Sequence, residues 1–255
     1  MSIQIIGRLY LVPAPLDFGC DTKSSLTDSM PKKTLEIAST LEYWICENAK
    51  STRAYLKRVN ELNPLSNPIQ SLNIQELPRE VHKKGDHNNN FDAKHLLQHA
   101  LLGRNLGLVS EAGMPAVADP GSSVVRAAHD LGIPVIPLVG PVSLLLSLAA
   151  SGLNGQNFAF VGYLPQENIH RSQRIKELES LALRTGQTQL FIETPYRNKV
   201  MMQSLLENLN PLTRLSVSSG LTLNSSLCRS ETIKQWRQKI SELDNSTPAV
   251  FAIGI

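Results

Sequence analysis

Cysteine is scarce in this sequence, and the three that are present, Cys20, Cys46 and Cys228, lie far apart without a Cys-x-x-Cys pair. An odd number of scattered cysteines argues against a disulfide framework and against a zinc knuckle. Aromatic residues make up only 5% of the chain, and no aromatic-rich ribbon for stacking single-stranded bases stands out. Lys and Arg outnumber Asp and Glu by only 25 to 22, so the charge permits an anionic partner without requiring one.

Long apolar runs are also missing. The longest nearly apolar stretch, 142–153, is interrupted by serines and is shorter than the ~20 residues that cross a bilayer. The first residues show no basic segment followed by an apolar one, and no small-residue cleavage site. We therefore expect a cytoplasmic protein that does not associate with a membrane.

The length of 255 residues exceeds what one ordinary core needs and predicts two domains. Short apolar runs alternate with segments of helical spacing in the first half, which is typical of a parallel sheet covered by helices. The predicted strands there span 9–12, 43–46, 69–72, 106–109 and 135–138. The predicted helices span 31–39, 52–61, 92–102 and 122–131, and the polar stretch 82–90 predicts a mobile loop.

A second series of elements follows a boundary that we place near Val139, which gives domains 1–139 and 140–255. Its predicted strands span 158–162, 189–192, 215–218 and 249–253, and its predicted helices span 171–183, 198–209 and 233–243, after a helix-like apolar run at 142–150. The expected fold class is therefore α/β, with two α/β domains: a mainly parallel five-stranded sheet, then a mixed sheet with helices.

Each strand of the first half ends in residues suited to binding. In open α/β sheets the ligand crevice lies outside the carboxyl ends of the strands, so these loops are expected to meet. They are the segments Pro13-Ala-Pro15, Glu47-Asn48, Ser110 to Pro115 and Gly140-Pro141. In the third loop, Gly113 lets the backbone approach a ligand closely, Pro115 and Pro120 stiffen the chain, and Gly121 opens the next helix. The same pattern also fits an ordinary strand-to-helix connection.

The stretch Leu108-Val-Ser-Glu-Ala-Gly-Met-Pro-Ala-Val-Ala-Asp-Pro-Gly121 resembles the Ser-Asp-Ala-Gly-Thr-Pro-x-x-Ser-Asp-Pro-Gly signature of the ribosomal RNA small subunit methyltransferase I family, in the tetrapyrrole-methylase superfamily. Three further segments are similar to that family in the same order. They are Leu9-Tyr-Leu-Val-Pro-Ala-Pro15, the pair Ser151-Gly-Leu153 and Phe158 to Pro165, and Phe191-Ile-Glu-Thr-Pro-Tyr-Arg197. The four matches together cover nearly the whole chain.

The resemblance implies an S-adenosylmethionine-dependent methyltransferase that methylates a ribose 2′-hydroxyl of small-subunit ribosomal RNA. It also implies a homodimer, with the cofactor folded into the cleft between the two domains. The cofactor-binding residues that it implies are Pro13, Gly113, Met114, Pro115, Val117, Ala118, Val142, Ser143, Glu193, Pro248 and Ala249. These contacts are mostly backbone and apolar, which suits a sulfonium cofactor.

Methyl transfer is an in-line displacement governed by alignment, so no metal is expected. A hydroxyl nucleophile must still lose its proton, and Glu47, Glu111 and His87 are the candidates to assist it. Glu111 is the foremost, because the related signature carries an acidic residue there. Each of the three also fits an ordinary capping or solvated role. His95 and His99 have metal-ligand spacing, but the sequence offers no evident third ligand.

Several departures from the family pattern leave the methyl acceptor open. They fall at Asp17 to Cys20, Asn48 to Lys50, Met114 and Ser219 to Asn224, where charged or polar residues of the family are replaced. A tetrapyrrole or other small molecule remains an alternative acceptor. A third hypothesis is that the chain binds the cofactor but has lost or changed its activity. Two cationic groups offer a face for RNA or are simply solvated helix surface: Arg53, Lys57 and Arg58, with Arg171, Arg174 and Lys176.

Overall fold

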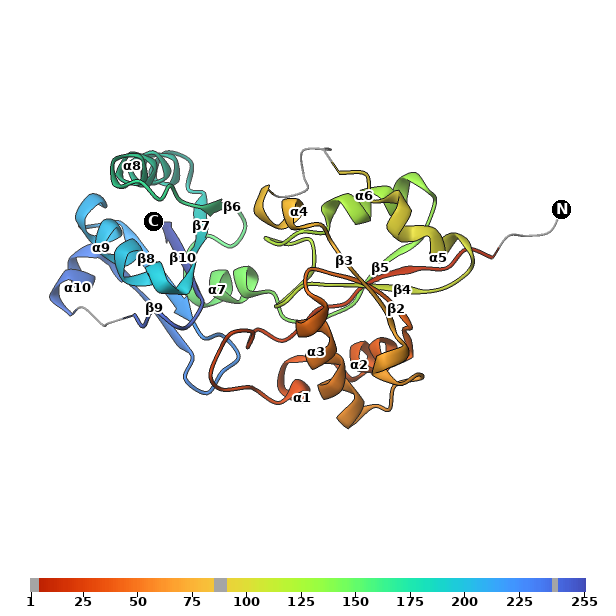
Figure 1. Cartoon of the computed structure of the whole chain (residues 1–255). Helices are drawn as coiled ribbons and strands as arrows, with labels where there is room; N and C mark the ends of the chain where they lie inside the picture. The colour runs from red at the N-terminus through yellow and green to blue at the C-terminus, as the bar shows by residue number, and fades with distance from the viewer. Residues whose placement is uncertain (1–4, 85–90, 240–242) are drawn as a thin grey trace. The chain divides into compact units, whose positions relative to one another are not determined.

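The computed structural model describes residues 5–84, 91–239 and 243–255. Its chain forms two compact units (Figure 1). Unit 1 consists of Met1–Phe18 with Ser24–Pro141, and unit 2 consists of Gly19–Lys23 with Val142–Ile255. No helix among the described residues is both long and apolar enough to span a membrane.

Unit 1 is built on a parallel sheet of five strands in the order β3-β2-β4-β1-β5. The strands are β1 (Leu9–Leu11), β2 (Tyr43–Cys46), β3 (Asn73–Glu76), β4 (Leu106–Val109) and β5 (Val135–Pro137). Leu9 pairs with Leu106 on one side and with Val135 on the other, so β1 lies in the interior of the sheet. All five strands therefore present their carboxyl ends at one edge.

Helices cover both faces of this sheet (Figure 1). One face packs against α1 (Leu26–Ser29), α2 (Lys32–Thr40) and α3 (Ala49–Leu62), and the other packs against α4 (Arg79–Lys84), the 3₁₀ helix η2 (Lys94–Leu97), α5 (Gln98–Leu101) and α6 (Ser122–Asp130). Strand β2 contributes to the cores on both faces. Trp44 and Cys46 pack in the core with α1, α2 and α3, and Ile45 packs in the core with α4, α5 and α6. A strand buried on both faces reads as a continuous apolar run, which is how Tyr43–Cys46 reads.

Unit 2 contains a mixed sheet in the order β6-β7-β10-β8-β9. Its strands are β6 (Phe158–Tyr163), β7 (Thr188–Glu193), β8 (Arg214–Ser219), β9 (Leu227–Thr232) and β10 (Ala249–Gly254). Strands β6 and β7 are parallel, and the other neighbours are antiparallel. The predicted fold class, a parallel five-stranded sheet followed by a mixed sheet, is confirmed.

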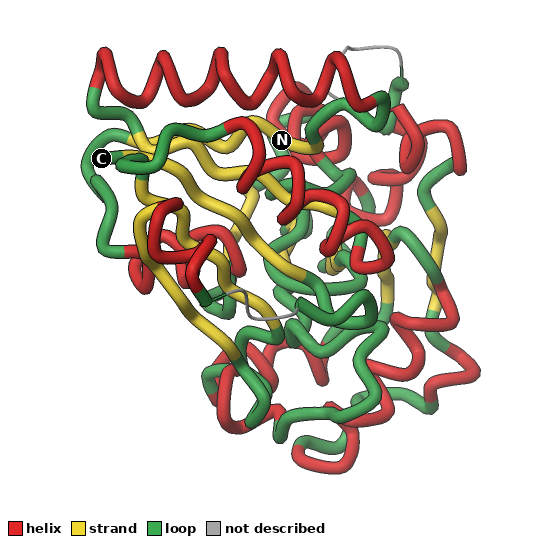
Figure 2. Tube along the Cα trace, turned by 90° about the vertical axis from the view of Figure 1, so that its left-hand side faces the viewer, coloured by secondary structure: helices red, strands yellow, loops and turns green. Residues whose placement is uncertain are grey.

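The two faces of the second sheet are also covered, as the helical and strand segments in Figure 2 show. Helices α8 (Asn168–Thr185), α9 (Asn198–Asn208) and α10 (Ile233–Gln238) pack on one face, and α7 (Ser143–Ser151) packs on the other. In β10 the side chains alternate: Phe251 packs in the core beneath α8, α9 and α10, and Val250 packs in the core beneath α7. The remaining short 3₁₀ helices are η1 (Ile69–Ser71) and η3 (Pro195–Arg197).

The structure corrects several predicted elements. The predicted strand 69–72 is wrong: Ile69–Ser71 is the 3₁₀ helix η1 after Pro68, and the edge strand β3 follows it. Residues 82–84 of the predicted loop belong to α4, and the rest of that loop, 85–90, lies outside the described residues. The edge strand β9 and the short helices α1 and α4 were not predicted. The third helix starts at Ala49 instead of 52, because Asn48 caps it.

Candidate cofactor and catalytic site

The carboxyl edge of the unit 1 sheet has the topology of a ligand site. The chain leaves β1 toward the helices of one face and leaves β4 toward α6 on the other face. Because β1 and β4 are neighbours, their connections diverge at this point. Such a switch point is where open α/β sheets bind their ligands.

The loops that follow β1 and β4 are joined by backbone hydrogen bonds. Ala14 N–H donates to the Gly113 carbonyl at 2.9 Å, and Gly113 N–H donates to the Ala14 carbonyl at 2.9 Å. A third loop packs closely: a Cβ placed on Gly140 would lie 2.2 Å from Pro13 Cγ, so no larger residue fits there. Pro13 and Gly113, both predicted cofactor residues, thus lie in one assembly of three strand-end loops.

The predicted cofactor loop has an unusual backbone. Gly113 and Gly121 have φ values of +69° and +132°, and the alanines Ala116 and Ala118 also have positive φ, at +63° and +66°. For a residue with a Cβ this conformation costs about 1–2 kcal/mol. Two such alanines in one loop are the kind of local strain that accumulates at functional sites.

The same loop borders a pocket of about 620 Å³ within unit 1. This volume is within the range of about 300–1,000 Å³ that small-molecule sites occupy. Most of its lining is apolar, and the polar groups come from α6: the lining residues are Leu11, Met114, Pro115, Ala116, Val117, Ser122, Val125, Arg126, His129, Asp130 and Pro137. Val117, one of the lining residues, is 41% exposed.

Three carboxyl groups interact electrostatically at this edge of the sheet. Glu47 follows β2, Glu111 follows β4, and Asp119 lies in the strained loop. Burial, together with the charges of Glu47 and Glu111, raises the pKa of Asp119 to about 7. A carboxyl group that titrates near neutral pH is suited to accept or donate a proton.

Sequence reasoning missed Asp119. The signal was present, because this residue is the Asp of the Ala-Asp-Pro-Gly half of the motif. The proline and glycine of this segment predict a stiff loop, but the sequence does not show that the Asp side chain before them is buried near other carboxyl groups. Of the three candidate residues, the structure brings Glu111 and Glu47 into one group with Asp119. His87 lies outside the described residues.

The amino end of α3 begins beside this group and is fully capped. The Asn48 side-chain oxygen accepts hydrogen bonds from Lys50 N–H and Ser51 N–H, at 2.9 and 3.3 Å. The Glu76 carboxylate, at the end of β3, accepts from Ala49 N–H at 2.6 Å. The departure Asn48 from the family pattern is therefore a helix cap, a role that Asn fills well.

The segment after Pro15 is fixed to the same helix. Arg58 makes a bidentate ion pair with Asp17, with both N–O distances 3.0 Å, and also donates to the Ser24 carbonyl at 2.6 Å. Asp17 is only 2% exposed. The Tyr55 hydroxyl donates to the Pro13 carbonyl at 3.2 Å. The altered segment Asp17 to Cys20 thus begins with a buried ion pair that holds the loop after β1.

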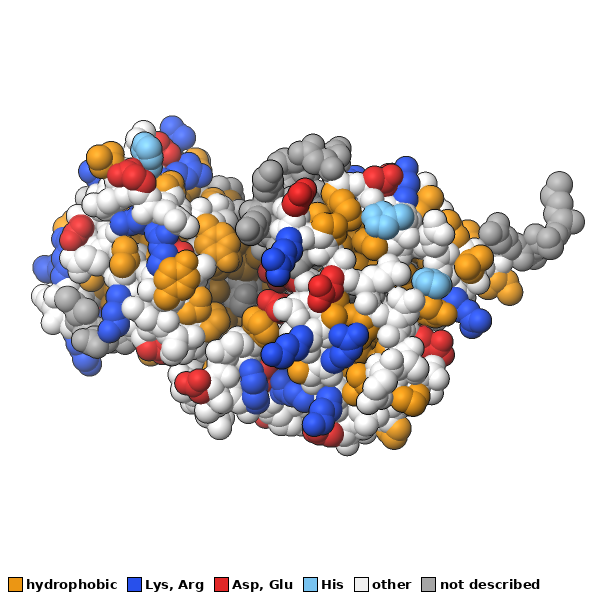
Figure 3. Space-filling view, in the orientation of Figure 1, with side chains coloured by type: hydrophobic (Ala, Val, Ile, Leu, Met, Phe, Trp, Pro, Cys, Tyr) orange, Lys and Arg blue, Asp and Glu red, His pale blue; other side chains and the backbone are white. Residues whose placement is uncertain are grey.

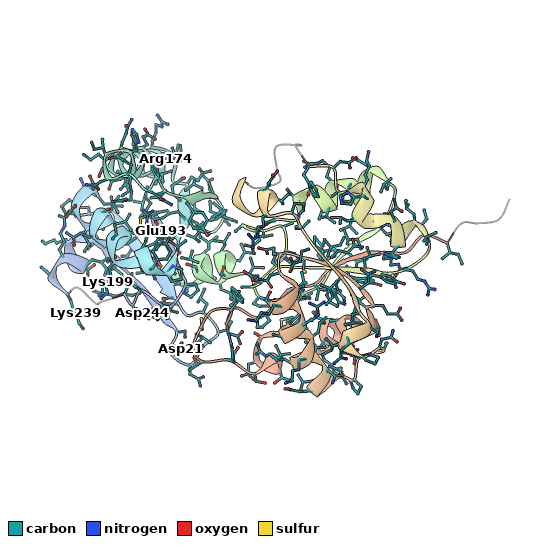
Figure 4. The ribbon with its side chains drawn as sticks, viewed as in Figure 1. Asp21, Arg174, Glu193, Lys199, Lys239 and Asp244 are labelled. Carbon is teal, nitrogen blue, oxygen red and sulfur yellow. The ribbon has the colours of Figure 1, made fainter. Side chains whose placement is uncertain are left out.

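In unit 2, the predicted residues Glu193, Pro248 and Ala249 are neighbours. Ala249, at the start of β10, pairs with Glu193 at the end of β7. Figure 4 labels Glu193, whose carboxylate accepts hydrogen bonds from Thr194 N–H at 2.8 Å and Thr194 Oγ1 at 3.1 Å. Its other oxygen lies 3.3 Å from Arg197 Nε. The side chain of Glu193 is therefore engaged within unit 2.

The predicted residues Val142 and Ser143 begin α7, with Val142 as the residue before its first turn. Leu144 of this helix packs with Val250, the residue after Ala249. Within unit 2 the amino end of α7 and the start of β10 are thus parts of one packed cluster.

The altered segment Ser219 to Asn224 makes a tight turn against Pro248. Gly220 N–H and Ser219 Oγ both donate to the Pro248 carbonyl, each at 3.3 Å. Thr222 has a φ of +73°, which is rare for a β-branched residue. This strained turn borders the predicted cofactor residues Pro248 and Ala249.

The two histidines with metal-ligand spacing pack against aromatic rings. The His99 ring lies 4.1 Å from the Tyr43 ring, and the His95 ring lies 5.8 Å from the Phe91 ring. Among the residues that the structure describes, no group of three or more His, Cys, Asp or Glu side chains is arranged to hold a metal ion.

Comparison with known proteins gives similar sequences along most of the chain, although no protein-family profile matches it. It is 27% identical over 237 residues to the ribosomal RNA small subunit methyltransferase I of Vibrio cholerae, a match covering 93% of this chain and 73% of that protein. It is 30% identical over 217 residues to the protein of the same name from Synechocystis, covering 85% of this chain and 68% of that protein.

A solved structure is similar in fold. The crystal structure of uroporphyrin-III-C-methyltransferase from Thermus thermophilus matches 97% of this chain and 92% of its own, with a TM-score of 0.53 and 18% identity. At this identity the likeness concerns the fold alone.

Proposed function

We propose that this chain, which belongs to the ribosomal RNA small subunit methyltransferase I family, transfers a methyl group from S-adenosylmethionine to small-subunit ribosomal RNA. The observation that carries this proposal is the similarity to named members of the family along most of the chain. The strained loop Gly113 to Gly121 supports it, because the segment that resembles the family signature also has an unusual backbone, with positive φ at Ala116 and Ala118.

The residues of the strand-end loops fit a sulfonium cofactor. The pocket beside Met114 and Val117 is mostly apolar and has the volume of a small-molecule site. When bound, S-adenosylmethionine would supply an electrophilic methyl group. We assign its binding to Pro13, Gly113, Met114, Pro115, Val117 and Ala118 in unit 1, and to Val142, Ser143, Glu193, Pro248 and Ala249 in unit 2. The side chain of Glu193 is already used, so its contribution would come from the backbone.

We assign the acceptor as a ribose 2′-hydroxyl, and the proton acceptor as the group of Asp119, Glu111 and Glu47. Asp119 is the member best suited to take the proton, since its pKa is about 7. Burial raises that pKa most, and the charges of Glu47 and Glu111 raise it further, which makes Asp119 a stronger base than an isolated carboxylate. Alignment of donor and acceptor supplies the rest of the rate, and the reaction needs no metal.

A homodimer in the cytoplasm completes the proposal. Size-exclusion chromatography with light scattering measures the oligomeric state. Fractionation of cells that express the tagged chain measures the location. Addition of a chelator to the methylation assay should leave the rate unchanged.

Two measurements test the activity. Titration calorimetry of the folded protein should give S-adenosylmethionine binding in the micromolar range; no heat with a folded sample would contradict the assignment of the cofactor. Mapping of ribose methylation in small-subunit rRNA from cells with and without the gene should show one lost 2′-O-methyl group. Unchanged rRNA together with intact cofactor binding would point to a small-molecule acceptor.

A further inference from the structure

The exposed face of α3 carries a row of cations. Lys50, Arg53 and Lys57 are all exposed and are spaced by three and four residues, so they share one side of the helix. The opposite side, with Tyr55 and Leu56, is buried against the sheet. At a rise of 1.5 Å per residue the row extends for about 10 Å. Figure 3 shows Lys and Arg side chains gathered on the surface over α3.

These three cations are not neutralised by neighbours. None of them forms an ion pair with another residue in the described parts of the chain. Glu61, in the last turn, is the single acidic residue of α3. A row of exposed like charges that form no ion pairs disfavours the folded state slightly through mutual repulsion, and it attracts anions.

Several cations of helices α2 and α8 are instead paired or buried. Lys32 and Lys33 of α2 both lie near Glu36, at 3.8 and 3.7 Å. In α8, Arg174 pairs with Glu177 at 3.1 Å. Arg171 is buried, and its guanidinium donates to Ser204 Oγ, Asn168 Oδ1 and backbone carbonyls. Arg171 is therefore excluded from an RNA-binding face, and the charge of Arg174 is partly offset by Glu177.

Helix α3 is rigidly connected to the candidate site. The Tyr55 hydroxyl donates a hydrogen bond to the Pro13 carbonyl, and Arg58 forms an ion pair with Asp17. The helix is therefore fixed to the loop that follows β1. Its first turn starts at the carboxyl end of β2, directly after Glu47. An anion held on the row of cations would therefore be held at a fixed position relative to the strand-end loops.

We propose that Lys50, Arg53 and Lys57 form a phosphate-contacting surface that positions the backbone of substrate RNA beside the strand-end loops of unit 1. This inference rests on the proposed function, and it names the part of the molecule that holds the substrate. The amide groups at the amino end of α3 are already capped by Asn48 and Glu76, so the three side chains must make the contacts.

The charges of the site fit this arrangement. The carboxyl groups of Glu47, Glu111 and Asp119 repel phosphates from the place where a ribose hydroxyl would lose its proton. The cations of α3 attract phosphates along the adjoining helix. Contacts of this kind supply most of the affinity of a nucleic-acid complex and make it dependent on salt.

The test compares the parent protein with the triple variant Lys50→Ala, Arg53→Ala, Lys57→Ala. Binding of in-vitro-transcribed small-subunit rRNA is measured by filter binding from 50 to 200 mM salt. We expect the dissociation constant of the variant to rise at least about 10-fold at low salt, and the slope of log K against log salt to fall by about 2 to 3. Binding of S-adenosylmethionine by calorimetry should be unchanged.

A charge-matched control removes three exposed cations elsewhere in unit 1, Arg8, Lys94 and Arg104. For this control, the slope of log K against log salt should differ from that of the parent by less than about one. An equal loss in both triple variants, or no loss in the α3 variant, would overturn the inference while the proposed function stood. If the parent binds S-adenosylmethionine but no rRNA, the proposed acceptor is wrong and the inference falls with it.

Discussion

Ala14 and Gly113 exchange both of their backbone hydrogen bonds, at 2.9 Å each, although they follow different strands. This antiparallel bridge begins where the parallel pairing of β1 and β4 has ended. The bridge fixes the loops that follow β1 and β4 through backbone atoms, so the neighbouring side chains can vary without changing the path of the chain. That explains how Met114 can stand where the family carries Thr without loss of the loop's path.

Gly113→Ala should destabilise the protein by about 1–2 kcal/mol, because φ is +69° and the new Cβ would lie 3.3 Å from Leu16 Cδ2. It should also weaken S-adenosylmethionine binding. Gly186→Ala is the matched control: its φ is +67°, its new Cβ meets nothing closer than 4.0 Å, and it lies at the end of α8. Chemical denaturation and calorimetry measure both effects. Equal cofactor affinity in the two variants would contradict a role of this loop in binding.

Asp119→Asn should stabilise the protein at high pH only. The folded-state pKa is raised from 3.8 to about 7, so stability of the parent falls as pH rises from about 4 to 7, where the unfolded chain has already released the proton. The gain of the variant over the parent should therefore be near zero below pH 4 and largest above pH 7, where it is at most about 4 kcal/mol. Urea denaturation at pH 4, 6 and 8 measures it, with the exposed Asp28→Asn as control. A gain that is independent of pH would contradict this environment.

The same variant tests the chemistry. If Asp119 accepts the proton, the methylation rate of the parent should rise with pH through about 7, since the ionised form is the active one. Asp119→Asn should lower the rate about 100-fold or more and remove this rise, while cofactor affinity stays similar. A pH profile that persists in Asp119→Asn would assign the titration to another group.

Arg58→Ala should cost about 2–4 kcal/mol of unfolding free energy, because it removes the bidentate partner of a carboxylate that is 2% exposed. Arg58→Lys should recover part of this loss, since an ammonium keeps the charge but not the paired geometry. Arg53→Ala, on the exposed face of the same helix, should change stability by less than about 0.5 kcal/mol. Similar losses for Arg53→Ala and Arg58→Ala would contradict a specific contribution of the ion pair, because alanine has a higher helix propensity than arginine at both positions.

Arg197→Ala should cost about 2 kcal/mol, since Glu193 is 7% exposed and loses a partner at 3.3 Å. S-adenosylmethionine affinity should change less than about threefold if Glu193 contributes through its backbone. The exposed Arg184→Ala is the control for the loss of one cation in unit 2. A large loss of affinity without a loss of stability would instead give the Glu193 carboxylate a direct role.

Strands whose side chains are buried on both faces were predictable from the sequence. Tyr43–Cys46 and Leu106–Val109 were predicted with their observed bounds, because a continuous apolar run has few other places in a fold. The edge strands β5 and β6 were also predicted, but the other two edge strands were not. Asn73–Glu76 and Leu227–Thr232 carry many polar side chains and are strands only because a neighbour supplies the hydrogen bonds.

The motif Gly113 to Gly121 was recognisable in the sequence, since glycine and proline act on their own backbone whatever surrounds them. The pKa of Asp119 was not, because it depends on burial and on the charges of Glu111 in the same loop and of Glu47, which follows another strand. Nor could the sequence separate Arg58, bound to Asp17, from Arg53, which is exposed on the same helix.

The sequence by itself determined the class of fold, the family and the strands that are buried on both faces, because these depend on local patterns of apolar residues and on short motifs. Only the tertiary structure decided which charges are paired, which carboxyl group titrates near neutral pH and which cations of α3 face solvent. Charge and burial are set by neighbours that are distant in the chain, and those neighbours are assembled only when the sheet of unit 1 forms.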